Sequence, residues 1–82
     1  MRYLLIANPV SGIGLAKAQI ASVTAFFRKH GQHIDVRLTG AAGDAERFAR
    51  EGVSLGYDVI IAGGGDGTIN EVLNGMSGGA TK

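Results

Sequence analysis

The stretch of this sequence best suited to chemistry is a run of glycines around one acid, GGGDGTIN at residues 63–70. Glycines without a Cβ atom let backbone N–H groups approach an anion closely, and the first turn of a following helix offers further unpaired N–H groups. An apolar run precedes the glycines, and Thr68 and Glu71 have the spacing of a capping box at a helix start. The pattern predicts a strand, a phosphate-binding turn and a helix. The simpler alternative is a tight turn whose glycines only make room for packing.

A second polar loop, NPVSG at residues 8–12, follows the first apolar run of the chain, residues 3–7. Proline has no backbone N–H to donate to a sheet, and asparagine and serine side chains bond nearby backbone groups. The strand predicted at residues 3–7 is therefore expected to end there in a loop. The hydroxyl groups of Ser11 and Thr68 can donate to phosphate oxygens. For Asn8 and Ser11, ordinary turn chemistry explains the residue types equally well.

Apolar patterns along the chain predict three strands and three helices. They are expected in the order strand 3–7, helix 15–29, strand 34–38, helix 44–55, strand 58–62 and helix 68–74. Gly31 and Gly56 suit helix ends, and Asp44 is placed to cap the second helix. Gly52 is expected to weaken that helix by roughly 0.5–1 kcal/mol relative to alanine. The glycines within residues 75–79 are expected to end the third helix.

The alternation of strands and helices predicts an α/β fold, a three-layer open parallel sheet with right-handed crossovers. If the first strand is central, the strand order is 2-1-3 and the first two helices cover opposite faces. The loops after the first and third strands, residues 8–12 and 63–68, would then flank one crevice, and Thr39 would lie on the same edge. The sequence therefore predicts a ligand site where the carboxyl ends of the strands meet.

Composition limits the class of protein. The chain has 82 residues and no cysteine, 45% of its residues are hydrophobic, and its formal charge is +1. The sequence lacks the basic patch of a protein that binds nucleic acid. Without cysteine, neither a thiolate metal site nor a disulfide can form. No apolar run approaches the roughly 18 residues of a membrane span, so the cytoplasm is the expected location. Chains of this size bury only about 60% of their unfolded surface, which suggests a fragment of a larger domain.

Two common phosphate-binding motifs are absent. A Walker A loop needs a lysine after its last glycine, and neither loop has one. The dinucleotide pattern needs a third glycine and an acid after the second strand, but that strand ends in Leu38 and Thr39. An ordinary NAD dehydrogenase is therefore disfavoured.

The combination of motifs resembles the start of the diacylglycerol kinase catalytic domain, which bacterial diacylglycerol and related lipid kinases share with sphingosine kinases. The resemblance rests on NPVSGIG at residues 8–14, on Thr39 with residues 43–45, and on GGDGTINEVLNG at residues 64–75. It covers essentially the whole chain. NAD kinases and phosphofructokinases carry similar glycine loops, but the NPxSG motif after the first strand favours the lipid kinases.

The resemblance implies an enzyme that uses ATP and Mg²⁺ to phosphorylate a lipid hydroxyl such as that of diacylglycerol. Residues 1–82 would form the N-terminal part of its ATP-binding domain, inactive alone, because in the family the catalytic base and the lipid-binding surface come from a later β-rich domain. The protein would be cytoplasmic and peripheral to the membrane that holds its lipid substrate. The expected nucleotide contacts are Asn8, Pro9, Val10, Ser11, Gly12, Thr39, Gly64, Gly65, Asp66, Gly67, Thr68, Ile69 and Asn70.

Asp66 is the expected organiser of Mg²⁺, directly or through water, since a carboxylate facing phosphate needs a cation. Its alternative role is to stabilise the helix dipole. Asn70 and Glu71 are as consistent with structure as with ligand contact. The polar side chains outside these loops are expected to be solvated: Lys17, His30 and His33.

Three alternatives to a lipid kinase and one surface feature follow from the same residues. An NAD kinase-like enzyme, which makes NADP from ATP and NAD, and a nucleotide-binding module without catalysis are the alternatives, and a purely structural α/β piece is the third. An exposed apolar surface is also expected beside Val72 and Leu73, with a tendency of the chain to self-associate.

Overall fold

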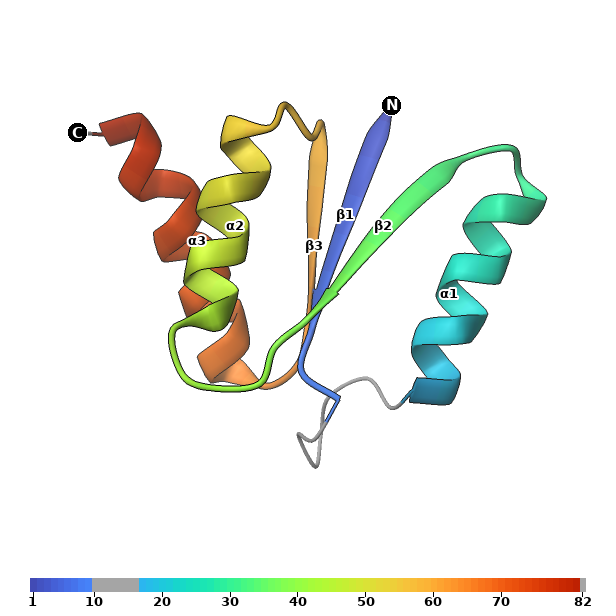
Figure 1. Ribbon diagram of the computed structural model, residues 1–82, viewed down its shortest axis with the longest axis horizontal. Helices are drawn as coiled ribbons and strands as arrows, with labels where there is room; N and C mark the ends of the chain where they lie inside the picture. Colours follow the sequence, from blue (N-terminus) through green and yellow to red (C-terminus); the bar gives the residue numbers. More distant parts are fainter. Residues whose placement is uncertain (10–16, 82) are drawn as a thin grey trace.

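The computed structural model describes residues 1–9 and 17–81, and it has three strands and three helices in alternation. Their bounds are β1 Arg2–Ala7, α1 Lys17–Lys29, β2 His33–Leu38, α2 Asp44–Ser54, β3 Val59–Gly63 and α3 Asp66–Thr81. The strands are parallel and lie in the order β2-β1-β3. Figure 1 shows α1 on one side of this sheet and α2 and α3 on the other. The predicted α/β fold and the 2-1-3 strand order are confirmed.

Residues of β1 alternate between two cores, because both faces of the central strand are covered. Leu5 and Ala7 pack with Ile20 of α1, while Leu4 and Ile6 pack with residues of α2 and α3. The side chains of Leu5 and Ile6 are fully buried. A strand with no exposed face needs an unbroken apolar run, and this explains the sequence at residues 3–7.

The predicted ends of α1 and α2 are confirmed. Gly31 has φ +73° and Gly56 has φ +85°, both in the left-handed region that favours glycine after a helix. The Gly31 N–H donates to the Arg28 carbonyl at 3.0 Å. Gly52 does not break α2, because it lies against the sheet: a Cβ atom there would be 2.8 Å from Cδ2 of Leu4.

The predicted bounds of the last helix, 68–74, are wrong at both ends. α3 begins at Asp66 and continues to Thr81, through the glycines that were expected to end it. Gly75 lies at the contact with α2, where a Cβ atom would be 2.3 Å from the carbonyl oxygen of Glu46. Close packing against α2 thus outweighs the low intrinsic helix propensity of glycine.

The predicted helix caps are also wrong. Thr68 lies inside α3, and the Glu71 carboxylate accepts a hydrogen bond from Gly43 N–H at 3.1 Å instead of bonding its own helix start. The N-cap of α2 is Gly43, with φ +91°. Asp44 is the first residue of α2 and accepts hydrogen bonds from the loop before it. The hydrogen bonds of Glu71 and Asp44 therefore go to N–H groups that the spacing of the helix-start residues did not indicate.

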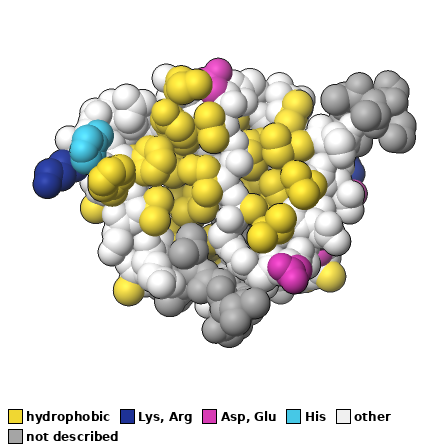
Figure 2. Space-filling model, turned by 180° about the vertical axis from the view of Figure 1, so that it is seen from behind, with side chains coloured by type: hydrophobic (Ala, Val, Ile, Leu, Met, Phe, Trp, Pro, Cys, Tyr) yellow, Lys and Arg dark blue, Asp and Glu magenta, His cyan; other side chains and the backbone are white. Residues whose placement is uncertain are grey.

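The expected exposed apolar surface on α3 is partly correct. Val72 is only 3% exposed because it joins the core under α2, whereas Leu73 is 57% exposed. Ile69 is also exposed. Figure 2 shows apolar side chains over much of the opposite side of the molecule from Figure 1. Among the described residues no helix is both long and apolar enough to cross a bilayer.

Candidate functional site

The carboxyl ends of the three strands are joined by hydrogen bonds. Asn8 N–H donates to the Gly63 carbonyl at 2.9 Å, and Thr39 N–H donates to the Ala7 carbonyl at 2.9 Å. The segments that follow the strands therefore start side by side. A cleft of about 450 Å³ opens at this edge. The described residues that line it are Asn8, Thr39, Gly40, Ala41, Ala42, Ala45, Gly65, Gly67, Thr68 and Glu71.

One wall of the cleft is the glycine turn at the start of α3. The Ile69 N–H donates to the Gly65 carbonyl at 3.1 Å, so the amides of residues 66–68 precede the first helical hydrogen bond. A Cβ atom built on Gly67 would meet no other atom within 4 Å. At Gly64 a Cβ atom would be 2.6 Å from Oγ1 of Thr68, so that glycine is required by packing. This wall has bare backbone and the positive end of a helix dipole, which together suit an anion.

Two threonines lie between the walls. Thr39 is the first residue after β2, and Thr68 lies in the first turn of α3; each is 9% exposed and lines the cleft. Both hydroxyl groups can donate or accept hydrogen bonds. The cleft thus brings together two hydroxyl groups from segments that are far apart in sequence.

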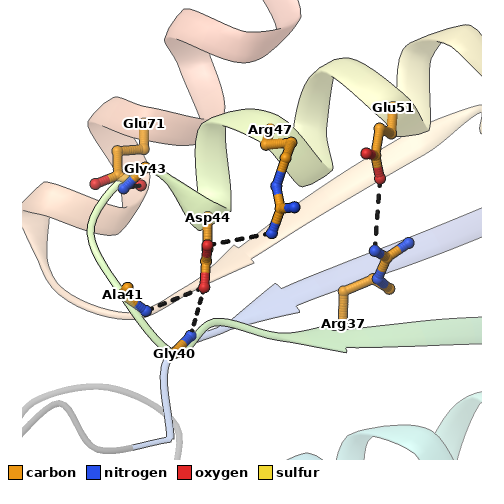
Figure 3. Close-up of polar contacts among 8 residues, drawn as sticks. All are labelled: Arg37, Gly40, Ala41, Gly43, Asp44, Arg47, Glu51 and Glu71. Carbon is orange, nitrogen blue, oxygen red and sulfur yellow. Dashed lines mark hydrogen bonds and ion pairs between the residues drawn. The ribbon is translucent and has the colours of Figure 1, made fainter.

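The facing wall is the loop of residues 40–43 between β2 and α2 (Figure 3). The Asp44 carboxylate accepts hydrogen bonds from Gly40 N–H at 2.8 Å and from Ala41 N–H at 3.0 Å. These bonds hold the pKa of Asp44 below its ordinary value of 3.8. Arg47 adds an ion pair to the same carboxylate at 3.2 Å. The amides of Gly40, Ala41 and Gly43 are bonded to protein carboxylates, so most of the anion-binding capacity of the cleft lies at the α3 wall.

The structure brings together only part of the predicted set. Of the expected nucleotide contacts, those that line the cleft are Asn8, Thr39, Gly65, Gly67 and Thr68. Pro9, Gly64, Asp66, Ile69 and Asn70 are described but do not line it, and Val10, Ser11 and Gly12 lie outside the described residues. Asp66, Ile69 and Asn70 are exposed on the first turns of α3.

Sequence reasoning missed the residues directly after Thr39. Gly40, Ala41 and Ala42 line the cleft because parallel strands present all their following loops at one edge. Their position directly after a parallel strand is the only feature of the sequence that indicates a place in the cleft, since their small side chains suggest no chemistry. Glu71 also lines the cleft, although its spacing from Thr68 indicated a cap.

The remaining polar candidates lie away from the cleft. His33 Nε2 is 2.7 Å from Oδ1 of Asp35, and His30 Nδ1 is 2.9 Å from the Phe26 carbonyl oxygen. Both histidines are exposed, as expected. In the part of the chain that the structure describes, no three His, Asp or Glu side chains are grouped to hold a metal ion.

Comparisons with known proteins agree on one family. A model of the diacylglycerol kinase catalytic domain matches residues 2–82. The diacylglycerol kinase of Bacillus subtilis (strain 168) is 43% identical over 76 residues, which are 93% of this chain and 25% of that protein. A "Probable lipid kinase YegS-like" of Klebsiella pneumoniae (strain 342) is 44% identical over 73 residues, 89% of this chain and 24% of that protein.

The fold is similar to that of a solved relative. A crystal structure of a diacylglycerol kinase from Bacillus anthracis superposes with a TM-score of 0.75 at 31% identity, covering 94% of this chain and 28% of that one. The chain thus spans about a quarter of the length of the relatives that it matches.

Proposed function

This chain belongs to the diacylglycerol kinase catalytic domain family, and from that premise we propose that it forms the ATP-binding part of a lipid kinase. The whole enzyme would transfer the γ-phosphate of ATP to a lipid hydroxyl, such as that of diacylglycerol. The observation that carries the proposal is the bare turn at Gly65 and Gly67, which lines the cleft beside Thr39 and Thr68.

The cleft fits a nucleotide in size and in polarity. Its volume of about 450 Å³ lies within the usual range of small-molecule sites, roughly 300–1,000 Å³. The phosphates would lie against the amides of residues 66–68, where the helix dipole favours negative charge. The rest of the nucleotide would extend toward Thr39 and the loop of residues 40–43.

Asp66 would hold Mg²⁺, directly or through water, beside the phosphates. Its exposed carboxylate in the first turn of α3 is an oxygen ligand of the kind that Mg²⁺ prefers, and the phosphate oxygens would supply further ligands. The ion would neutralise the charge that develops on the transferred phosphoryl group. The residues of this chain would then only bind and orient the nucleotide.

The acceptor side of the reaction is expected elsewhere in the protein. Phosphoryl transfer needs a group that orients or deprotonates the attacking hydroxyl, and an acceptor pocket. The relatives are about four times as long as this chain, so we propose that these parts come from outside residues 1–82. The chain alone is then inactive, and the whole enzyme works in the cytoplasm at the surface of the membrane that holds its lipid.

The test is a close-approach variant in the intact protein that contains this chain. Gly67→Val adds a side chain where a Cβ atom meets nothing within 4 Å, so the fold is expected to survive while phosphate approach is blocked. Isothermal titration with Mg·ATP should show binding to the wild type and at least about a tenfold weaker binding to Gly67→Val. Circular dichroism confirms the fold, and Gly67→Ala should have an intermediate effect. Equal binding by all three proteins would contradict the site.

The acceptor is identified with γ-labelled ATP. The intact protein should transfer label to diacylglycerol in mixed micelles and not to NAD, while the isolated chain should transfer none. Labelled NADP would instead support an NAD kinase-like enzyme. ATP binding without transfer to either acceptor would indicate a nucleotide-binding module.

A further inference from the structure

Carboxylates hold the loop that faces the glycine turn (Figure 3). Asp44, the residue directly after the loop, bonds the N–H groups of Gly40 and Ala41. The carboxylate of Glu71, a residue of α3, accepts a hydrogen bond from Gly43 N–H at 3.1 Å, and the two residues are 28 positions apart in the sequence. One of these carboxylates is local, whereas the other ties the loop to a different helix.

The packing of α3 on α2 explains why Glu71 reaches this loop. Glu71 lies one turn before Gly75, and Gly75 brings the backbone of α3 against the backbone of Glu46. Val72, the next residue, is buried in the core under α2. The backbone of Glu71 is therefore fixed beside the start of α2, and its side chain needs no rearrangement to accept the Gly43 N–H.

Helix α3 forms one wall of the cleft and bonds the loop that forms the other. The first turn of α3 provides Gly67 and Thr68, and Glu71 in the next turn both lines the cleft and bonds the facing loop. One hydrogen bond therefore links the two walls directly, in addition to the packing of α3 on α2. We propose that Glu71 is a positioning residue for the nucleotide, which fixes the loop of residues 40–43 opposite the glycine turn. This inference rests on the proposed function and adds a role that the capping-box spacing did not predict.

Two other roles for Glu71 give different results. Because α2 has no side-chain cap of its own, a carboxylate near its N-terminus could act only on stability, through the helix dipole. A direct contact between the Glu71 charge and the ligand would depend on the charge and not on the bond to Gly43. The experiment must therefore distinguish three roles of Glu71: accepting the hydrogen bond from Gly43, placing a charge near the ligand, and stabilising the fold.

Four variants of the intact protein make this separation. Glu71→Ala removes the acceptor, Glu71→Gln keeps an acceptor oxygen without the charge, and Glu71→Asp keeps the charge on a shorter side chain. Glu51→Ala is the matched control, since Glu51 is an acid of α2 that bonds Arg37 at 3.5 Å and does not line the cleft. For each protein we would measure the Kd of Mg·ATP, the KM for ATP, kcat, the thermal midpoint, and hydrogen exchange over residues 40–43.

The positioning role predicts one pattern. Glu71→Ala and Glu71→Asp should raise the Kd and KM by about fivefold to tenfold, as expected for one lost hydrogen bond to a charged acceptor, and leave kcat unchanged. Exchange over residues 40–43 should become faster in both. Glu71→Gln should keep the loop protected and raise the Kd by less than Glu71→Ala does, because its neutral oxygen accepts a weaker bond. Glu51→Ala should stay within about twofold of the wild type on every measurement.

Three outcomes overturn the inference. If Glu71→Ala lowers only the thermal midpoint, Glu71 is a cap. If Glu71→Gln binds as weakly as Glu71→Ala while its loop stays protected, the charge acts on the ligand directly. If the wild type binds no ATP, the proposed function fails and the nucleotide role fails with it, whereas the exchange data still report whether Glu71 holds the loop.

Discussion

A Cβ atom on Gly75 would lie 2.3 Å from the carbonyl oxygen of Glu46, so α2 and α3 touch backbone to backbone at this point. A glycine that looked like the end of a helix is instead the contact that fixes two helices together. This contact places the glycine turn and the loop of residues 40–43 on either side of one cleft.

Gly75→Ala should destabilise the protein although alanine is the better helix former. The added methyl group meets the backbone of Glu46 and Arg50, which cannot turn away as a side chain can. We expect a loss of about 1–3 kcal/mol in the free energy of unfolding, the usual cost of overpacking. Chemical denaturation of the intact protein measures it. Gly67→Ala is the matched control in the same helix and should cost nothing; an unchanged midpoint for Gly75→Ala would contradict the close contact.

The stability that Asp44 contributes should depend on pH in the acid range. Its folded pKa is lowered because it accepts hydrogen bonds from Gly40 and Ala41. A lowered carboxyl pKa contributes stability that is fully present above the ordinary value of 3.8 and is lost as the pH falls through the folded pKa. Asp44→Ala should therefore have a lower thermal midpoint than the wild type at neutral pH, and the two should converge in acid.

The control for this prediction is Asp44→Asn, which keeps an acceptor oxygen but does not titrate. Scanning calorimetry across the acid range should show that its difference from Asp44→Ala does not vanish at low pH. If wild type and Asp44→Ala differ equally at every pH, the ionised carboxylate is not what holds the loop.

Tyr57→Phe should raise the pKa of Asp35. The Tyr57 hydroxyl donates to Oδ2 of Asp35, and this bond is the first cause that lowers the Asp35 pKa, followed by the contact with His33. The same bond raises the pKa of Tyr57. The stability that Asp35 contributes is lost as the pH falls through its lowered pKa, whereas that of Tyr57 is lost as the pH rises through its raised pKa.

Carbon-13 titration of the Asp35 carboxyl group measures this change directly. Its midpoint should move up toward 3.8 in Tyr57→Phe and should stay at the wild-type value in Tyr3→Phe, whose hydroxyl lies near Met1 instead. An unmoved midpoint in Tyr57→Phe would assign the low pKa to His33.

Asp66→Asn should weaken nucleotide binding only when Mg²⁺ is present. The side chain is exposed at the start of α3, so the isosteric change should leave the fold intact. We expect the Kd of Mg·ATP to rise by about 10-fold to 100-fold, the range found when groups that support a bound metal are removed. Titration of ATP in EDTA is the control, and equal effects with and without Mg²⁺ would favour the helix-dipole role.

The sequence by itself determined the order of elements, the parallel sheet and the edge that carries the cleft. Short apolar runs at residues 3–7 and 59–62 alternate with helical patterns and so predict strands of a parallel sheet, and parallel strands with helical crossovers bring their following loops to one edge. The sequence alone therefore assigns Asn8, Thr39 and the glycine turn to a common cleft.

The tertiary structure alone decided the length of α3 and the partners of its polar residues. Local propensity and local spacing predict the wrong roles for Gly75 and Glu71, because they describe a chain without neighbours. In the fold, α2 lies against α3, so a glycine becomes a close contact and a capping acid becomes a link to Gly43. Contacts between segments that are 28 positions apart have no local signature, and it is these contacts that shape the cleft.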